Sequence, residues 1–300
     1  MQSVGFIGLG AMGNPMAKNM IKAGYSLLVY DVNATQIAEL AALGAQKAGN
    51  PREVGEKCST VIMMLPNSPH VETVLYGENG LVAGMKPGGV IIDMSTIAPV
   101  AAQNFARKAA EKQITILDAP VSGGTVGAQA GTLAIMAGGP REVLDRVMPM
   151  LEAMGKTIVH AGPSGAGQTF KMANQIMVGI SWAAVAEAWT IGVKAGADPE
   201  LLQKVLIGGS ARCWAIERVP ATILAGNFEP GFMIDLQHKD LCIAMETSKE
   251  LNVPLNLTSI ALQYYEAARG LGFGRKDHSA VIKVLEHLTG VNAGKKSSSK

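Results

Sequence analysis

The sequence has few cysteines and few charged residues, and both shortages exclude classes of protein. Among 300 residues only Cys58, Cys213 and Cys242 occur, with no Cys-x-x-Cys or Cys/His ligand spacing. We therefore expect neither a disulfide framework nor a metal site. Charged residues make up 17% of the chain and apolar residues 48%. That balance excludes an intrinsically disordered chain.

The net charge is close to zero, which bears on the partners of the chain. Lys and Arg number 26 against 24 Asp and Glu, and Lys295, Lys296 and Lys300 lie in the last six positions. The rest of the chain is near neutral, so no nucleic-acid partner is expected. The first ten residues, MQSVGFIGLG, have no positive region before a short, glycine-broken apolar run. We expect a strand there rather than a signal peptide, and a cytoplasmic protein.

Residues 173–193 form the most membrane-like stretch of the sequence. This stretch contains Asn174, Gln175 and Glu187, which a lipid-exposed span tolerates poorly. A helix that is buried in protein on several sides explains the stretch better, so no membrane partner is expected.

Short apolar runs alternate with helical stretches through the first half of the chain. Strands are expected in SVGFIG, SLLVY, TVIMML, VIIDM, ITILD, TLAIMA and TIVHA. Helices are expected at Met12–Ala23, Ala34–Ala42, Pro99–Lys112 and Arg141–Met154. This alternation predicts a doubly wound, mostly parallel α/β sheet of the Rossmann type, covered by helices on both faces. The predicted domain covers residues 1–163.

Strand signals nearly stop after Gly165, and helical patterns replace them. The expected helices are 167–195, 199–207, 212–224, 235–251, 255–271 and 278–288. They predict an all-α domain over residues 164–290 that begins with a long interdomain helix and serves substrate binding and oligomerisation. Residues 291–300, nearly free of apolar side chains at their end, are expected to form a disordered tail.

A glycine-rich motif predicts a dinucleotide site. It consists of Gly8, Leu9, Gly10, Ala11, Met12 and Gly13. The motif follows a predicted strand and opens a helix, and Asp31 ends the next strand, 18 residues after Gly13. This context is typical of a site that holds a pyrophosphate at a helix N-terminus. Asp31, with no Arg or Lys after it, favours NAD(H) over NADP(H), although Asp31 could instead cap the following helix.

Two later strand ends are expected to complete the cofactor cleft. Leu65 and Pro66 follow one apolar strand and can form an apolar wall against the adenosine. Thr96 follows the next strand and can reach the nicotinamide end. Ligands bind beyond the carboxyl ends of strands in such sheets. Ordinary strand-to-loop turns remain the alternative for both segments.

Four stretches together make the sequence resemble the β-hydroxyacid dehydrogenase family. VGFIGLGAMGNPMA (residues 4–17) resembles its cofactor signature, and DAPVSGG (residues 118–124) its substrate signature. GAGQTFKMANQ (residues 165–175) resembles the catalytic signature, and KDL (residues 239–241) a second cofactor segment. The resemblance covers about residues 1–290. It implies NAD(P)-dependent interconversion of a β-hydroxyacid and its semialdehyde in a homodimer or homotetramer.

The resemblance also implies roles for individual residues. Lys171 is the implied general acid and base, and Asn174 is its neighbour in the catalytic pair. The implied substrate-binding residues are Ser122, Gly123, Gly124, Thr96, Asn174, Gln175 and Asp240, and Lys239 joins the cofactor-binding residues. Chemistry agrees, because a lysine can donate a proton to a developing alkoxide and consecutive glycines let backbone N–H groups approach a carboxylate. The alternatives are a solvated lysine, a flexible turn and a surface ion pair.

The substrate is expected to be a small carboxylate. The stretch Phe228–Leu236 resembles tartronate semialdehyde and 2-(hydroxymethyl)glutarate enzymes, whereas Gly208–Trp214 partly resembles 3-hydroxyisobutyrate dehydrogenases. Reduction of tartronate semialdehyde to D-glycerate is the preferred reaction, and 3-hydroxyisobutyrate or 2-(hydroxymethyl)glutarate/4-hydroxybutyrate-type activities are alternatives. A 6-phosphogluconate dehydrogenase-like decarboxylase needs a longer helical domain. A non-catalytic interaction domain is disfavoured because Lys171 is retained.

Overall fold

The structure is a computed structural model that describes residues 3–294. The chain forms two compact units, Met1–Lys171 and Met172–Lys300. The boundary between these units lies inside one long helix, whereas the boundary expected at 163 lies in the loop that precedes this helix. The first unit holds the whole sheet, and the second is built from helices.

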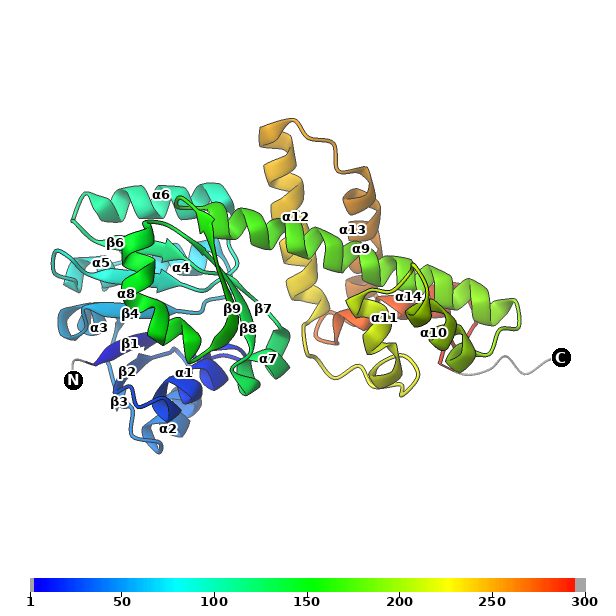
Figure 1. The fold of residues 1–300 in the computed structure, drawn as a ribbon, viewed down its shortest axis with the longest axis horizontal. Helices are drawn as coiled ribbons and strands as arrows, with labels where there is room; N and C mark the ends of the chain where they lie inside the picture. The colour runs from blue at the N-terminus through cyan, green and yellow to red at the C-terminus, as the bar shows by residue number, and fades with distance from the viewer. Residues whose placement is uncertain (1–2, 295–300) are drawn as a thin grey trace. The chain divides into compact units, whose positions relative to one another are not determined.

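The first unit alternates strands and helices, as its sequence predicts (Figure 1). Its strands are β1 (Val4–Ile7), β2 (Leu27–Tyr30), β3 (Gln46–Lys47), β4 (Thr60–Met63), β5 (Val90–Asp93), β6 (Thr115–Asp118), β7 (Val121–Ser122), β8 (Leu133–Gly138) and β9 (Gly155–Gly162). Its helices are α1 (Gly13–Lys22), α2 (Ala34–Ala41), α3 (Pro51–Lys57), α4 (Ser68–Tyr76), α5 (Leu81–Gly84), α6 (Pro99–Ala110), α7 (Gly124–Ala130) and α8 (Arg141–Glu152).

The sheet is mostly parallel, and its order is β3-β2-β1-β4-β5-β6-β8-β7, with β9 paired to β8. Strands β1, β2, β4, β5 and β6 run in one direction, so their carboxyl ends meet at one edge of the sheet. Strand β8 runs antiparallel to β6 and β7, which the sequence pattern did not indicate. The predicted Rossmann architecture is confirmed, with an antiparallel addition beyond β6.

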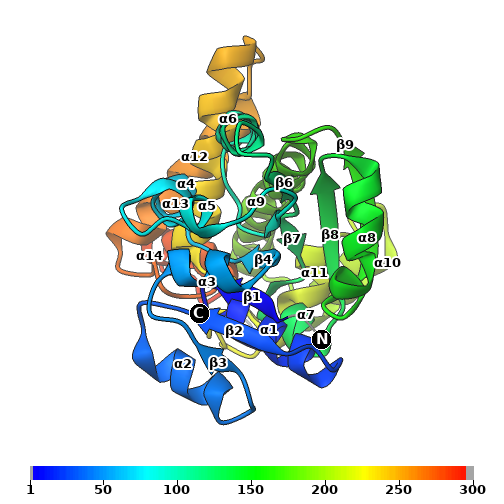
Figure 2. The ribbon, with the colours of Figure 1, turned by 90° about the vertical axis from the view of Figure 1, so that its left-hand side faces the viewer.

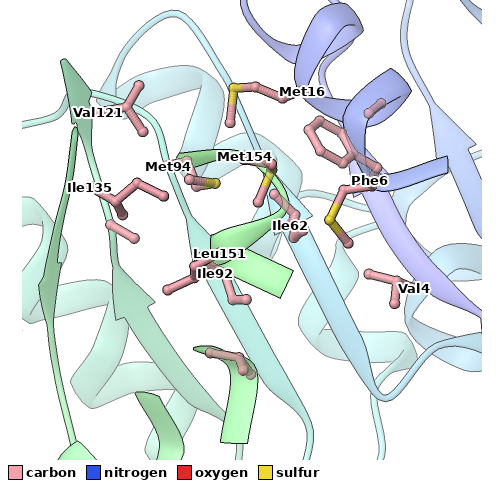
Figure 3. Packing of buried hydrophobic residues seen from close by; sticks show 14 of the residues in the cluster. Val4, Phe6, Met16, Ile62, Ile92, Met94, Val121, Ile135, Leu151 and Met154 are labelled. Atoms are coloured by element: carbon pink, nitrogen blue, oxygen red, sulfur yellow. The ribbon is translucent and has the colours of Figure 1, made fainter. Parts of the chain in front are cut away.

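Successive strand residues pack into two cores, one on each face of the sheet. Phe6 and Ile62 belong to a core shared with α1, α2, α7 and α8, and Figure 3 shows these strand residues beside Met16 and Leu151. Ile7 belongs to the opposite core, which α3, α4, α5 and α6 cover. Figure 2 shows α8 and the α3–α5 group on opposite sides of the sheet. Because both faces are buried, the strands are apolar throughout, as continuous runs predict.

The second unit is helical throughout its described part, apart from one isolated bridge between Met233 and Asp277. Helix α9 (Ala166–Lys194) enters it from the first unit, and the remaining elements are α10 (Pro199–Gly208), α11 (Trp214–Arg218), η1 (Val219–Ala221), α12 (Ile234–Leu251), α13 (Asn256–Gly270), η2 (His278–Val281) and α14 (Ile282–Thr289). Its core is centred on the fully buried Trp182, Trp189 and Tyr265.

The end of the second unit differs from the expected tail. Ala293 is fully buried in the helical core, and its N–H donates to the Glu286 carboxylate at 2.8 Å. Val291 also packs against this core, so residues 291–294 continue the packed structure. The remainder of the predicted tail, residues 295–300, lies outside the described residues.

Helix α9 is long and apolar enough to cross a membrane by these two criteria alone. Its best window has a mean hydropathy of 1.5, and 44% of that window is buried inside the protein. The core helix of a water-soluble protein passes the same test, so the expectation of no membrane partner stays a prediction.

Candidate active site

The glycine-rich motif forms the turn between β1 and α1, as predicted. Gly8 has a φ of +91°, and a side chain on it would collide with the Met64 carbonyl. A side chain on Gly13 would collide with the Gly8 carbonyl. Gly10, by contrast, is exposed and has open space where a Cβ would stand. The turn is therefore closed on its inner side and open at Gly10, which suits the close approach of a diphosphate to the backbone.

Helix α1 begins beside this open space without a capping side chain. Its N-cap is Met12, which makes no side-chain cap hydrogen bond, and no acidic residue lies in the first turn. The first N–H groups of a helix have no partner within the helix and carry a partial positive charge. This N-terminus thus fits the phosphates of a dinucleotide.

Asp31 follows β2 and lies against the glycine turn. Its Oδ2 accepts the Leu9 N–H at 2.5 Å, and its Oδ1 accepts the Asn33 N–H at 2.7 Å. The N-cap of α2 is Asn33, whose side chain accepts the Thr35 N–H, so the alternative that Asp31 caps this helix is wrong. A carboxylate fixed at this point suits ribose hydroxyls and opposes a 2′-phosphate.

Leu65, Pro66 and Thr96 lie at neighbouring strand ends of the same sheet edge. Leu65 and Thr96 are half-buried and Pro66 is exposed. The Leu65 N–H donates to Ser95 Oγ at 2.9 Å, which ties the loop after β4 to the loop after β5. The structure therefore brings these two predicted segments together within the first unit.

Ser122, Gly123 and Gly124 form the turn from β7 into α7. Gly123 has a φ of +136° and Gly124 a φ of +61°, conformations that L side chains rarely adopt. Ser122 is half-buried and Gly123 is exposed. The two glycines are required by the backbone here, and the turn can present N–H groups to a small anion.

Lys171 lies near the start of α9 and is only 4% exposed. The alternative of a solvated lysine is therefore wrong. A buried amine is a suitable proton donor and acceptor, because burial keeps water from competing for its proton. Lys171 is the last residue of the first unit, so this unit carries the proposed proton donor together with the predicted cofactor residues.

The second unit contains a buried polar cluster between α9 and α12. Gln175 donates from Nε2 to Asp240 Oδ2 at 2.7 Å, and Gln237 Nε2 donates to the Gln175 carbonyl at 3.0 Å. Lys239 Nζ lies 3.1 Å from Asp240 Oδ1, and Asp240 is only 2% exposed. The alternative of a surface ion pair is therefore wrong, because the carboxylate is buried.

Asn174 immediately precedes Gln175 on α9. Its Oδ1 is buried and has no hydrogen-bond partner within residues 3–294. A buried polar atom without a partner is costly, so a ligand group that donates to it would be stabilised there. Asn174 follows Lys171 by three positions, and both residues belong to α9.

Several functional candidates were missing from the sequence-based set. These are the buried polar residues Asp118, Ser95 and Gln168 in the first unit and Gln237 in the second. Ser95 bonds to the predicted residue Leu65 and Gln237 to Gln175, whereas Asp118 and Gln168 bond to each other. Asp118 lies inside the DAPVSGG motif and Gln168 inside the GAGQTFKMANQ motif, and these motifs were the sequence signal for both residues. Burial raises the pKa of Asp118, and backbone N–H groups of Gly165 and Gln168 oppose this increase. No cluster that could hold a metal ion occurs among the described residues.

Known proteins resemble this chain along nearly its whole length. The NAD binding domain of 6-phosphogluconate dehydrogenase matches residues 3–162, and the NAD-binding domain of NADP-dependent 3-hydroxyisobutyrate dehydrogenase matches residues 165–285. The chain is 45% identical to 2-(hydroxymethyl)glutarate dehydrogenase of Eubacterium barkeri, covering 96% of each chain. It is 42% identical to 2-hydroxy-3-oxopropionate reductase of Escherichia coli, covering 94% of this chain and 97% of that one.

A solved structure agrees with these matches. The Mycobacterium tuberculosis 3-hydroxyisobutyrate dehydrogenase with L-serine superposes with a TM-score of 0.88 at 34% identity. The match covers 95% of this chain and 99% of that one.

Proposed function

Because the chain belongs to the 3-hydroxyisobutyrate dehydrogenase family of NAD(P)-dependent β-hydroxyacid dehydrogenases, we propose that it reduces tartronate semialdehyde to D-glycerate with NADH. The observation that carries the proposal is the buried Lys171 near the start of α9, in the unit that also holds the dinucleotide turn. The Phe228–Leu236 stretch supports the choice of substrate. The relative at 45% identity supports 2-(hydroxymethyl)glutarate chemistry as the second candidate.

The proposed role of Lys171 follows from the charge that develops in the reaction. The bound nicotinamide supplies or accepts the hydride. When a carbonyl is reduced, negative charge grows on its oxygen, and the ammonium group of Lys171 stabilises that charge and donates the proton. In the reverse direction the neutral amine takes the hydroxyl proton. Asn174, with its buried Oδ1, is proposed to hold the reacting group or the Lys171 side chain.

The substrate carboxylate is proposed to bind at the Ser122–Gly124 turn. The turn offers backbone N–H groups and one hydroxyl, and its two positive φ angles favour glycines, which bring no side chain into the approach. An alcohol or aldehyde without a carboxylate would leave these donors unpaired, at a cost of about 1–3 kcal/mol. A compact acid is therefore preferred over a simple alcohol or aldehyde as the substrate.

NADH is proposed as the preferred cofactor because of the position of Asp31. Its carboxylate is fixed by the Leu9 and Asn33 N–H groups at the edge of the glycine turn. A 2′-phosphate there would meet a like charge. The next residue, Val32, is 93% exposed and brings no positive charge to offset it.

The chain is proposed to act as a cytoplasmic homodimer or homotetramer. Large apolar side chains are exposed on helices of the second unit, including Met177 and Ile191 on α9 and Leu201 and Val205 on α10. Exposed apolar surface of this kind is typical of subunit interfaces.

One kinetic experiment tests the proposed reaction. We expect kcat/KM to be highest for tartronate semialdehyde in a panel with methylmalonate semialdehyde, succinic semialdehyde and 2-formylglutarate. The Lys171→Ala variant is expected to lose at least about a hundredfold in kcat and to retain NADH binding. A tenfold preference for another acid would replace the substrate but keep the class. Normal turnover by folded Lys171→Ala would overturn the role of the lysine.

A further inference from the structure

Asp118 binds the beginning of the helix that carries Lys171. This aspartate ends β6 and is 2% exposed. Its Oδ1 accepts the Gly165 N–H at 2.7 Å, and its Oδ2 accepts the Gln168 N–H at 3.0 Å. The Gly165 N–H lies immediately before α9 and the Gln168 N–H lies in its first turn, where backbone N–H groups have no helical partner. One side chain thus joins the end of a central strand to the start of this helix.

Gln168 makes a second connection from the same helical turn. It is 1% exposed, and its Oε1 accepts the Ile97 N–H at 3.1 Å while its Nε2 donates to the Ser95 carbonyl at 2.8 Å. These two hydrogen bonds bind the backbone on either side of Thr96. Because Ser95 Oγ also accepts the Leu65 N–H, the connection continues to the loop after β4. Hydrogen bonds therefore link α9 to three neighbouring strand ends.

Close packing leaves this connection little freedom to move. A Cβ on Gly138 would stand 2.5 Å from Asp118 Oδ1, and a Cβ on Gly167 would stand 2.6 Å from the Asp118 carbonyl. The first turn of α9 thus lies directly against the sheet edge, with no side chain between them. Asp118 and Gln168 are within the first unit, as is Lys171.

We propose that Asp118 and Gln168 are positioning residues that hold Lys171 in register with the strand-end loops containing Leu65 and Thr96. The inference rests on the proposed function, in which Lys171 transfers the proton. Lys171 follows Gln168 by three residues, so both lie on neighbouring turns of one helical face. A shift of the first turn displaces the amine, and a misplacement of about 1 Å can cost about a hundredfold in rate.

The test uses variants of similar volume and measures position separately from activity. Gln168→Met removes both side-chain bonds, and Asp118→Asn replaces one acceptor with a donor facing an N–H group. We expect each to lower kcat about ten- to a hundredfold, to change the dissociation constant for NADH less than about threefold, and to shift the pH profile of kcat. Amide hydrogen exchange over residues 165–171 is expected to become faster.

A matched control comes from the same unit. Tyr76→Phe removes the hydrogen bond from the Tyr76 hydroxyl to the Phe105 carbonyl, 2.7 Å long, between α4 and α6. It deletes one hydrogen bond without touching the strand-end network. We expect its kcat, pH profile and exchange over residues 165–171 to match those of the wild type.

The outcomes separate this inference from the proposed function. Unchanged kcat and pH profile in folded Gln168→Met overturn the positioning role, as does a loss of kcat without faster exchange over residues 165–171. If Lys171→Ala keeps normal turnover, the proposed function fails. Hydrogen exchange then still decides whether Asp118 and Gln168 hold the helix.

Discussion

Asp277 offers a quantitative test of the second unit. Its side chain is 6% exposed and accepts four hydrogen bonds. Oδ2 accepts the N–H groups of Gly231 at 2.9 Å and Phe232 at 3.2 Å. Oδ1 accepts the Ser279 N–H at 3.1 Å and the Ser279 hydroxyl at 2.6 Å. Asp277 thus joins the 231–232 backbone to the start of η2.

The expected cost of Asp277→Ala follows from the donors that it leaves behind. Ser279 is completely buried, so its N–H cannot reach water, which costs about 1–3 kcal/mol. Gly231 and Phe232 are half-buried, so water can partly replace the carboxylate at their N–H groups. The loss of each of these two hydrogen bonds is expected to cost about 1 kcal/mol of stability. We expect the free energy of unfolding of the second unit to fall by about 3–5 kcal/mol.

Urea titration followed by tryptophan fluorescence measures this loss. The 3 tryptophans, Trp182, Trp189 and Trp214, all lie in the second unit, so the signal reports on that unit. The control is Asp235→Ala, which removes an exposed ion pair with Arg269 and should cost no more than about 1 kcal/mol. A loss below about 1 kcal/mol for Asp277→Ala would refute the reasoning.

Three further predictions concern the cofactor, one thiol and assembly. Asp31→Ala should narrow the ratio of kcat/KM for NADH over NADPH, and adding Val32→Arg should narrow it further; a wild type that prefers NADPH contradicts this. Burial raises the pKa of the Cys58 thiol to about 11, so ionisation favours the unfolded chain at high pH. The stability of the wild type relative to Cys58→Val should therefore be constant below about pH 8.5 and fall as the pH rises towards 11 in urea titrations. Met177→Lys should reduce the mass measured by light scattering if α9 contributes to the subunit interface, and an unchanged mass removes α9 from it.

Local patterns in the sequence predicted most of the first unit. The runs containing Phe6, Ile62 and Ile92 are apolar on both faces, and such runs predict buried parallel strands. Strand β3 was missed because it is two exposed residues long. Helices α3 and α4 were missed although Asn50 and Asn67 cap them and a proline follows within their first turns. An Asn followed by a proline in this way is a sequence signal for the start of a helix.

The network around α9 could not be predicted from spacing. Gln168 bonds to the Ser95 carbonyl across 73 positions, and Asp118 bonds to Gly165 across 47. Periodicity shows which face of an element is buried, but it does not show which distant backbone group a polar side chain meets. The motifs indicated the segments that form the network, but only the structure shows which of their residues make the hydrogen bonds.

The uninterrupted course of α9 restricts how this chain can be recombined with its relatives. The helix runs from Gln175 to the Trp182–Trp189 core without a proline, so the amide that binds Asp240 and this core share one helical phase. Inserting a single residue between them rotates one against the other by about 100°, whereas seven residues restore the phase to within about 20°. Chimeras that join the two halves of different relatives inside α9 should therefore keep the residue count of this helix unchanged.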